Sequence, residues 1–277
     1  ELGYWVYREA AARNIPFIAA HAHSSPLGMD KNSLFRFLLK HLMRPYLTHR
    51  FTCNELCGRW LFGRKGMKDA VVVRNAIDAG KFSYSPETRE RVRREMGWEG
   101  KLVAGHTGNF SWPKNHEFLL RVFQAFLVLH PDSLLVLAGS GGEKEEQVRQ
   151  EAERAEWRGR IRLLGGRDDI PDLLQGMDVF VFPSWFEGFG IAMLEAQAAG
   201  LPVLASDRVP EDAAVVPGHV SFLSLRESPA VWAREMEELA CGWRRNDTAE
   251  AIRQAGLDIA GNAQKLQEFY LEQGGES

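Results

Sequence analysis

The sequence predicts an α/β fold made of two units with parallel sheets, of which the first is only partly present. Helical and strand patterns alternate along all 277 residues, and the predicted strands are short and apolar. Hydrophobic residues make up 45% and charged residues 26% of the chain, which excludes disordered, collagen-like and low-complexity proteins. No apolar run approaches the roughly 20 residues of a membrane-spanning helix.

The first unit, residues 1–76, alternates helix and strand three times. Periodicity predicts helices over 4–13, 34–43 and 54–62, and strands over 15–20, 50–53 and 70–73. Pro45 stops the second helix, and Asn54 is a candidate N-cap of the third. Three strands are few for a parallel sheet that is covered on both faces, and the chain starts at Glu1 without a visible signal peptide. We therefore expect a fragment that begins inside this unit.

The second unit, residues 77–247, has a longer and more regular alternation, typical of a doubly wound sheet. Its predicted strands are 102–105, 134–138, 161–164, 178–182 and 202–205. The segment 115–130 has apolar residues at helical spacing and is expected to face a core. The tail, 248–277, is predicted to be a docking helix that is broken once or twice, at Gly256 and Gly261.

Charge and cysteine content restrict the partners and the compartment. The net charge of −3 gives no general case for binding nucleic acid. The three cysteines lack zinc-ligand spacing and fit a reducing cytoplasm. Residues 31–68, however, carry nine Lys/Arg against one acid, and include the cationic amphipathic helix 33–44. This helix either lies on an anionic membrane or packs its apolar face on the sheet, so we expect a cytoplasmic protein with, at most, peripheral membrane contact.

The segment 183–196 carries the most informative pattern, because it follows a predicted strand and opens a helix. Gly188 and Gly190 let the backbone approach a ligand, and the free N–H groups at the helix start suit a phosphate. Glu187 and Glu195 flank this turn, at most about 12 Å apart along a helix. One carboxylate can therefore reach hydroxyls beyond the phosphates, and the other can reach hydroxyls on the near side. That arrangement of polyol, phosphate and polyol is the outline of a nucleotide sugar.

Each of these features has a plainer alternative. Two glutamates eight residues apart are, on their own, more often a turn cap and a solvated helix residue. The two glycines and the position after a strand favour the binding interpretation.

Two further loops follow strands of the second unit. In the loop 108–116, Lys114 precedes a helix N-terminus, where its ammonium and the helix dipole could jointly hold a phosphate. The loop 165–171, which contains Arg167, either presents backbone groups to a base or is a simple helix start. In the first unit, His23 follows a predicted strand and is either a site residue or part of the core, whereas His106 lies within a strand and is expected to be structural.

These residues resemble the retaining GT-B glycosyltransferases of glycosyltransferase family 4, and within it the branch that builds bacterial exopolysaccharide and capsule. The resemblance runs over essentially the whole chain and includes the segments 73–78, 108–116, 183–196 and 255–259, with Leu266 and Tyr270. It implies two facing Rossmann-like domains: 1–76 on the acceptor side, 77–247 as the donor-binding domain, and a tail helix over 248–277 that crosses back to the first domain.

The resemblance also implies a role for each matching residue. The donor-binding set would be Gly108, Asn109, Lys114, Arg167, Phe189, Gly190, Ile191 and Glu195. Within it, Lys114 would hold the diphosphate and Glu195 the ribose hydroxyls. Three residues would be catalytic: His23, pointing at the donor from the first domain, Glu187, on the donor sugar, and Lys114.

The reaction that the resemblance implies is hexosyl transfer, with retained anomeric configuration, from a UDP-linked donor to a hydroxyl of a glycan or lipid-linked oligosaccharide. No D-x-D pair is available, so neither a metal nor another cofactor is expected. One departure is Asn109, where the family usually carries an arginine, so the leaving diphosphate depends more on Lys114 and the helix dipole.

Two alternatives remain at this point: a non-catalytic nucleotide-sugar-binding fragment, and another GT-B enzyme of sugar nucleotides such as an epimerase. A dinucleotide-binding oxidoreductase and a P-loop protein are disfavoured, because their glycine motifs are absent.

Overall fold

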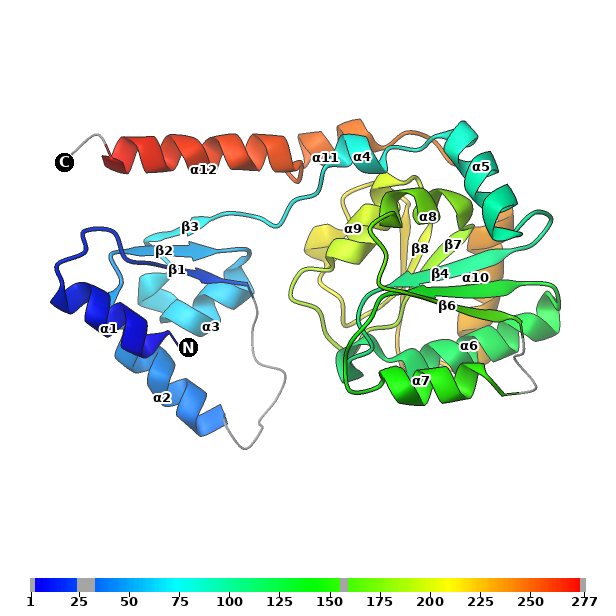
Figure 1. Cartoon of the computed structure of the whole chain (residues 1–277), viewed down its shortest axis with the longest axis horizontal. Coiled ribbons are helices and arrows are strands. Elements are labelled where there is room, and N and C mark those ends of the chain that lie inside the picture. The colour runs from blue at the N-terminus through cyan, green and yellow to red at the C-terminus, as the bar shows by residue number, and fades with distance from the viewer. Residues whose placement is uncertain (1–2, 24–32, 155–158, 275–277) are drawn as a thin grey trace. The chain divides into compact units, whose positions relative to one another are not determined.

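The computed structural model describes residues 3–23, 33–154 and 159–274, and divides into two compact units (Figure 1). Unit 1 comprises residues 1–75 together with 262–277, and unit 2 comprises residues 76–261. Both units are built on parallel sheets with helices between the strands, as the sequence predicts. Among the described helices, none is both long enough and apolar enough to cross a membrane.

Unit 1 contains a parallel sheet with the strand order β1-β2-β3. Its elements are α1 (Tyr4–Ala12), β1 (Ala19–Ala22), α2 (Ser33–Met43), the 3-10 turn η1 (Arg44–Tyr46), β2 (His49–Thr52), α3 (Glu55–Gly66) and β3 (Ala70–Val72). Asn54 caps α3, because its side-chain oxygen accepts a hydrogen bond of 2.9 Å from the backbone N–H of Cys57. Ile18, Met43, Cys53, Cys57 and Leu61 are among the residues of its small core.

The first strand lies later in the chain than the predicted 15–20. Asn14 has a φ of 55°, which turns the chain after α1, and Ile15 is 47% exposed. Pro16 has no N–H to donate to a ladder. Pairing with β2 therefore starts only at Ala19, opposite His49.

The last helix, α12 (Ile259–Gly274), contributes aromatic residues to unit 1. The ring of Phe269 lies 5.2 Å from that of Phe51 and 5.7 Å from that of His49, both on β2. The side chains of His49 and Gln273 are joined by a hydrogen bond of 3.1 Å. These contacts place the C-terminal half of α12 against the sheet of unit 1.

Unit 2 has a sheet of six parallel strands in the order β6-β5-β4-β7-β8-β9. The strands are β4 (Val103–Thr107), β5 (Leu134–Ala138), β6 (Ile161–Gly165), β7 (Val179–Phe182), β8 (Val203–Ser206) and β9 (Val220–Leu223). The strand order runs outward in both directions from β4 and β7, so the topological switch point lies between these two strands. The edge strand β9 is not among the predicted strands, because its half-buried residues form no continuous apolar run.

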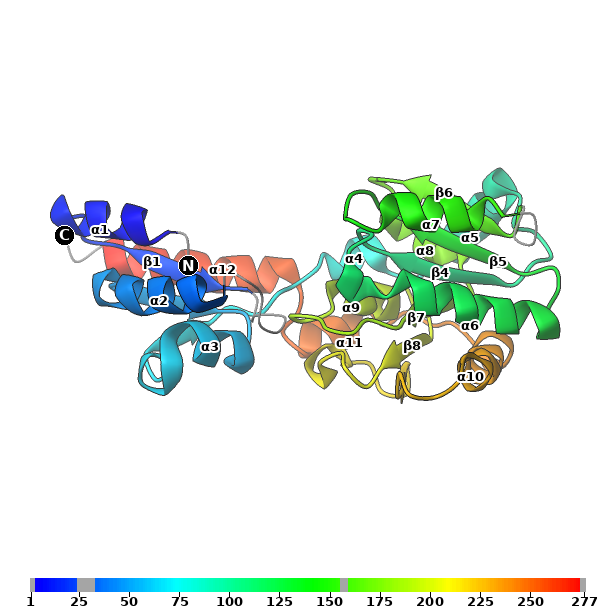
Figure 2. The ribbon, with the colours of Figure 1, turned by 90° about the horizontal axis from the view of Figure 1, so that it is seen from below.

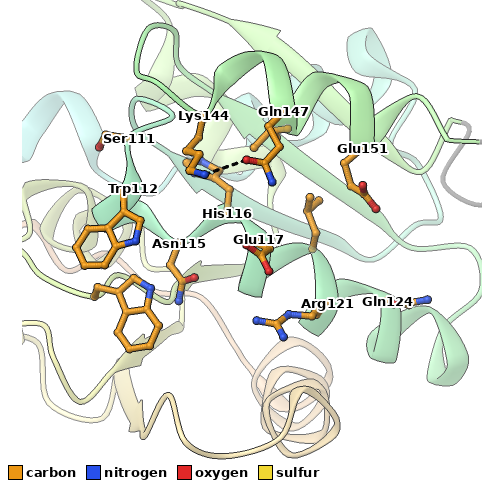
Figure 3. Close-up of a pocket in the computed structure, with 13 residues that line it drawn as sticks. Ser111, Trp112, Asn115, His116, Glu117, Arg121, Gln124, Lys144, Gln147 and Glu151 are labelled. Carbon is orange, nitrogen blue, oxygen red and sulfur yellow. Dashed lines mark hydrogen bonds between the residues drawn. The ribbon is translucent and has the colours of Figure 1, made fainter.

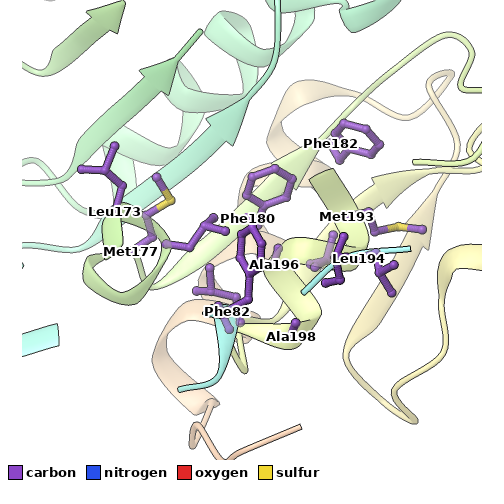
Figure 4. Packing of buried hydrophobic residues seen from close by; sticks show 14 of the residues in the cluster. Phe82, Leu173, Met177, Phe180, Phe182, Met193, Leu194, Ala196 and Ala198 are labelled. Carbon is purple, nitrogen blue, oxygen red and sulfur yellow. The ribbon is translucent and has the colours of Figure 1, made fainter. Parts of the chain in front are cut away.

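Helices cover both faces of this sheet (Figure 2). The helices on one face are α6 (His116–Leu129), α7 (Glu145–Ala152) and α10 (Pro229–Gly242). Those on the other face are α4 (Ala79–Phe82), α5 (Pro86–Met96), α8 (Ile170–Gly176), α9 (Ile191–Ala198) and α11 (Ala249–Gln254). On this second face, Phe180 and Phe182 pack with Met193 and Leu194 of α9, with no measurable exposure (Figure 4). The start of α9 is thereby fixed against β7.

The tail is broken once between α11 and α12. Gly256, with a φ of 70°, terminates α11, whereas Gly261 lies inside α12 and does not interrupt it. At the break, the backbone of Ile77 accepts a hydrogen bond from Ile259 and donates one to Leu257. The tail therefore returns beside the segment that begins unit 2.

Candidate functional site

The switch point of unit 2 brings together two loops that are far apart in the sequence. One loop follows β4 and ends in the short turn η2 (Trp112–Lys114); the other follows β7 and leads to α9. The backbone N–H of Trp185 donates to the carbonyl oxygen of Pro113 at 2.7 Å, and the side-chain amide of Asn115 donates to that of Pro183 at 3.0 Å. Because these bonds join the loops directly, side chains on both loops lie at the same place.

Lys114 and Glu187 form an ion pair at this junction. The distance between Nζ of Lys114 and Oε1 of Glu187 is 2.8 Å, and the two side chains are only 19% and 13% exposed. The ammonium also lies 5.1 Å from the ring centre of Phe182. Because both side chains are largely shielded from water, their mutual attraction is screened less than that of a surface ion pair.

The beginning of α9 supplies backbone donors beside this pair. Gly190 caps the helix with a φ of 96°, a conformation that favours glycine. The first N–H groups of a helix have no partner within it and, together with the dipole, attract an anion. Phe189 is buried at 4% exposure, whereas the side chain of Ile191 is 42% exposed.

Glu195 lies one turn into α9 and has an unusual acidity. Burial raises its pKa from the ordinary 4.5 to about 7, although the positive charge of Lys114 acts in the opposite direction. The carboxyl group is therefore partly protonated at neutral pH. Both glutamates of the E-x7-E segment thus interact electrostatically with the one lysine.

Two buried histidines near Lys114, His106 and His116, do not add positive charge to the site. Burial lowers the pKa of His106 well below its usual range and that of His116 to about 4; Lys114 contributes to both shifts. His106 lies inside β4, and its Nδ1 is 2.9 Å from the carbonyl oxygen of Val181. Both imidazoles are consequently neutral at pH 7, and the ammonium of Lys114 is the positive group at this position.

A glycine-rich loop after β5, residues 139–142, packs against the loop that follows β4 and was not among the predicted site segments. Gly139 follows β5 and approaches so closely that a Cβ there would lie 1.9 Å from the carbonyl oxygen of Gly108. A Cβ on Gly142 would lie 2.4 Å from the carbonyl carbon of Phe110. Gly108 itself has a φ of 149°, and a Cβ there would lie 3.3 Å from Cε of Lys114. The run Gly139-Ser140-Gly141-Gly142, directly after a predicted strand, is the sequence signal that could have indicated this loop.

Two other residues of the predicted donor set have local partners. Asn109 is exposed, and its side-chain oxygen accepts a hydrogen bond of 2.7 Å from the hydroxyl of Ser111. Arg167 makes two hydrogen bonds to Asp169, of 2.8 and 2.6 Å, which raise the pKa of its guanidinium. The guanidinium of Arg167 would have to exchange this carboxylate for a ligand.

His23 belongs to unit 1, whereas the other predicted site residues lie in unit 2. It directly follows β1, is exposed, and its ring centre is 3.9 Å from that of His21. Burial, together with His23, lowers the pKa of His21 to about 4. The exposure of His23 argues against core packing, which was the alternative interpretation of this residue.

No group of three or more His, Cys, Asp or Glu side chains that could hold a metal ion occurs within residues 3–23, 33–154 and 159–274. The potential ligand contacts of the switch point are an ammonium, two carboxyl groups and the backbone N–H groups of a helix start. This set suits a ligand that combines hydroxyl groups with phosphates.

Comparisons with known proteins agree with this geometry. The family described as glycosyl transferases group 1 matches residues 88–256. EpsF of Bacillus subtilis (strain 168), which is named as a glycosyltransferase, is 32% identical over 272 residues, covering 94% of this chain and 70% of that protein. The UDP-Gal:alpha-D-GlcNAc-diphosphoundecaprenol alpha-1,3-galactosyltransferase of Escherichia coli is 30% identical over 208 residues, covering 72% of this chain and 53% of that protein.

The crystal structure of Anabaena HepE in complex with UDP shows the same fold. Its TM-score is 0.78 at 19% sequence identity, and the match covers 97% of this chain and 76% of that one. The predicted GT-B class, an α/β fold with parallel sheets, is confirmed by these matches. The family match spans more than half of the chain and includes both loops of the switch point. This chain therefore belongs to the glycosyl transferases group 1 family.

Proposed function

We propose that the chain is a retaining hexosyltransferase of family 4, which moves a sugar from a UDP-linked donor to a hydroxyl of a glycan or lipid-linked oligosaccharide in exopolysaccharide or capsule synthesis. The observation that carries the proposal is the shielded ion pair of Lys114 and Glu187 beside the start of α9. The galactosyltransferase among the relatives uses, by its name, a UDP-linked sugar and a diphosphoundecaprenol-linked acceptor, and HepE was solved with UDP.

In this proposal, the diphosphate takes the place of Glu187 beside Lys114. The ammonium and the N–H groups at the start of α9 hold the phosphate oxygens, and Glu187 turns to a hydroxyl of the donor sugar. Glu195 accepts hydrogen bonds from the ribose hydroxyls. The bond between the anomeric carbon and the diphosphate breaks on the same face on which the bond to the acceptor oxygen forms. The acceptor proton passes to the leaving phosphate, so that no protein base is required.

We also propose that the reaction needs no metal ion or other cofactor. The charge that develops on the leaving diphosphate is met by Lys114 and by the dipole of α9. Turnover should then be the same in excess EDTA as in millimolar Mg²⁺ or Mn²⁺. A requirement for either ion would contradict this part of the proposal.

Calorimetric titration with UDP, GDP and ADP tests the donor site. UDP should bind with a micromolar Kd, and Lys114→Ala and Glu195→Ala should each abolish this binding. Glu90→Ala, which removes an exposed carboxylate from α5, is the matched control and should bind as the parent protein does. Absence of binding of all three nucleotides to a folded protein would refute the donor site.

Product analysis separates transfer from the other reactions of sugar nucleotides. Lys114→Ala and Glu187→Ala should each reduce turnover by about 100-fold or more, since each removes a charged group from the reacting diphosphate or sugar. Isomerised donor without transfer would identify an epimerase. Nucleotide-sugar binding without turnover would identify a binding module.

We further propose that the protein is cytoplasmic and that α2 makes peripheral contact with an anionic membrane. Only part of this helix packs on unit 1: Leu39 and Met43 are buried. The apolar side chains of Leu34, Phe35, Phe37, Leu38 and Leu42 are between 42% and 81% exposed.

Two cations of the basic stretch, residues 31–68, point toward the protein. Lys40 donates to the carbonyl oxygen of Trp60, and Arg44 donates to that of Leu61. Lys31, the first residue of that stretch, lies outside the described residues.

Flotation with liposomes tests this contact. The protein should float with vesicles that contain phosphatidylglycerol and less with pure phosphatidylcholine. Leu38→Glu should abolish flotation, whereas Val128→Glu, at an 81% exposed position of α6, should not. Equal flotation of both variants, or none of the parent protein, would contradict a membrane contact through α2.

A further inference from the structure

A cavity of about 590 Å³ opens between α6 and α7, on the face of unit 2 that carries these helices (Figure 3). Its volume lies in the range of small-molecule sites. Its wall on α6 includes Glu117, Arg121 and Gln124, and that on α7 includes Gln147 and Glu151. None of the residues proposed above to bind the donor lines this cavity.

Two tryptophans form one end of the cavity. The rings of Trp112 and Trp185 are parallel within 6°, and their centres are 6.3 Å apart. The two residues remain 53% and 43% exposed. Hydrogen bonds hold the backbone at both residues: the N–H of Trp112 donates to the carboxylate of Glu143 at 2.6 Å, and that of Trp185 donates to the carbonyl oxygen of Pro113. The two exposed indoles, with nearly parallel rings, form an aromatic platform at this end of the cavity.

The polar lining has balanced charge. Glu117 and Glu151 are acidic, Arg121 and Lys144 are basic, and Gln124 and Gln147 are neutral. Lys144 donates to the side chain of Gln147 at 3.0 Å, as Figure 3 shows. A strongly anionic or cationic ligand would find no excess of opposite charge here. A ligand with many hydroxyl groups would find both donors and acceptors.

From these observations we propose that the cavity between α6 and α7, with the platform of Trp112 and Trp185, binds a neutral oligosaccharide. The C–H face of a pyranose ring is apolar and flat enough to pack on an indole, while its hydroxyls bond to groups such as Gln147 and Arg121. The platform lies on the two loops that also carry Lys114 and Glu187. The cavity would therefore hold a portion of a glycan next to the proposed donor site. This inference goes beyond that site and does not depend on it.

The test uses the whole 277-residue chain and three neutral probes: maltohexaose, cellohexaose and the hexamer of N-acetylglucosamine. Binding is measured by calorimetry and by the NMR signals of the eight tryptophan indoles. At least one probe should bind saturably below about 10 mM and shift the indole signals of Trp112 and Trp185. Trp112→Ala and Trp185→Ala should each raise the Kd of this binding by about tenfold or more, because each removes one hydrophobic or stacking contact with the sugar. Trp5→Ala, at a 62% exposed tryptophan of unit 1, is the matched control and should leave it unchanged.

A parallel UDP titration separates this inference from the proposed function. Trp112→Ala and Trp185→Ala should still bind UDP, and Lys114→Ala should still bind the oligosaccharide. No saturable binding of any probe, binding that both tryptophan variants retain, or loss of UDP binding in these variants would each overturn the proposal. Failure of UDP to bind would refute the donor site but leave the oligosaccharide site standing.

Discussion

Replacing Glu195 with glutamine should stabilise the protein above neutral pH and leave it unchanged in acid. Burial raises the pKa of this carboxyl from 4.5 to about 7, so the fold favours its protonated form. Below about pH 4.5 the group is protonated in both the folded and the unfolded chain, and it has no effect. Between about pH 4.5 and 7 only the unfolded chain ionises, and the free energy of unfolding falls as the pH rises.

The size of this effect follows from the shift. The rise of this pKa from 4.5 to about 7 corresponds to about 3 kcal/mol of the free energy of unfolding, which is lost in full above about pH 7. Glutamine remains neutral at every pH. Glu195→Gln should therefore be more stable than the parent protein by up to about 3 kcal/mol at pH 8, with no difference at pH 4.

Urea unfolding of both proteins from about pH 4 to pH 8.5 measures this difference. Glu90→Gln, at an exposed position of α5, is the matched control and should show no such trend. The reasoning would be refuted if the difference between Glu195→Gln and the parent protein did not change with pH, or if the parent were the more stable at pH 8. Loss of UDP binding in the stabilised variant would indicate that the strain at Glu195 serves the ligand.

Three further changes have defined outcomes. Asn109→Arg should tighten UDP binding by about tenfold in calorimetry, because it adds a cation to the loop of Lys114 at an exposed position; weaker binding would contradict the diphosphate site. Gly139→Ala should lower the free energy of unfolding by about 2 kcal/mol or more and impair UDP binding, since its Cβ would lie 1.9 Å from the carbonyl oxygen of Gly108. Gly141→Ala, with a φ of 75° but open space around it, is the control and should cost about 1 kcal/mol in the same urea titration. Asn54→Ala should destabilise unit 1 by about 1 kcal/mol through loss of the α3 cap, and an unchanged urea midpoint would show that the cap is dispensable.

Much of the fold could be predicted from the sequence, because buried parallel strands are continuous apolar runs. The predicted strand 134–138 matches β5 to the residue, and the other predicted strands of unit 2 differ from the observed ones by at most two residues at either end. Errors arose where burial is weak. Residues 15–18 are apolar but precede the ladder, and the edge strand β9 is only half buried.

The candidate site was predictable only as separate pieces. Glycines, a lysine and two glutamates after strands indicated phosphate and hydroxyl binding, but their distances depend on the strand order. Lys114 and Glu187 meet because β4 and β7 are neighbours, although 73 residues separate them. The tryptophan platform arises in the same way, since neither Trp112 nor Trp185 stands in a pattern that a single sequence reveals.

The paired backbone of Ile77 with Leu257 and Ile259 has a consequence for how the chain is connected. The two points at which the chain enters and leaves unit 2 are hydrogen-bonded to each other, and the N–H of Ala79 also donates to the side chain of Asp258 at 3.0 Å. Unit 2 is thus an inserted domain whose two ends are hydrogen-bonded to each other by its own residues. We expect that unit 2 can be excised, transplanted or circularly permuted at these ends without unpairing a strand of its sheet.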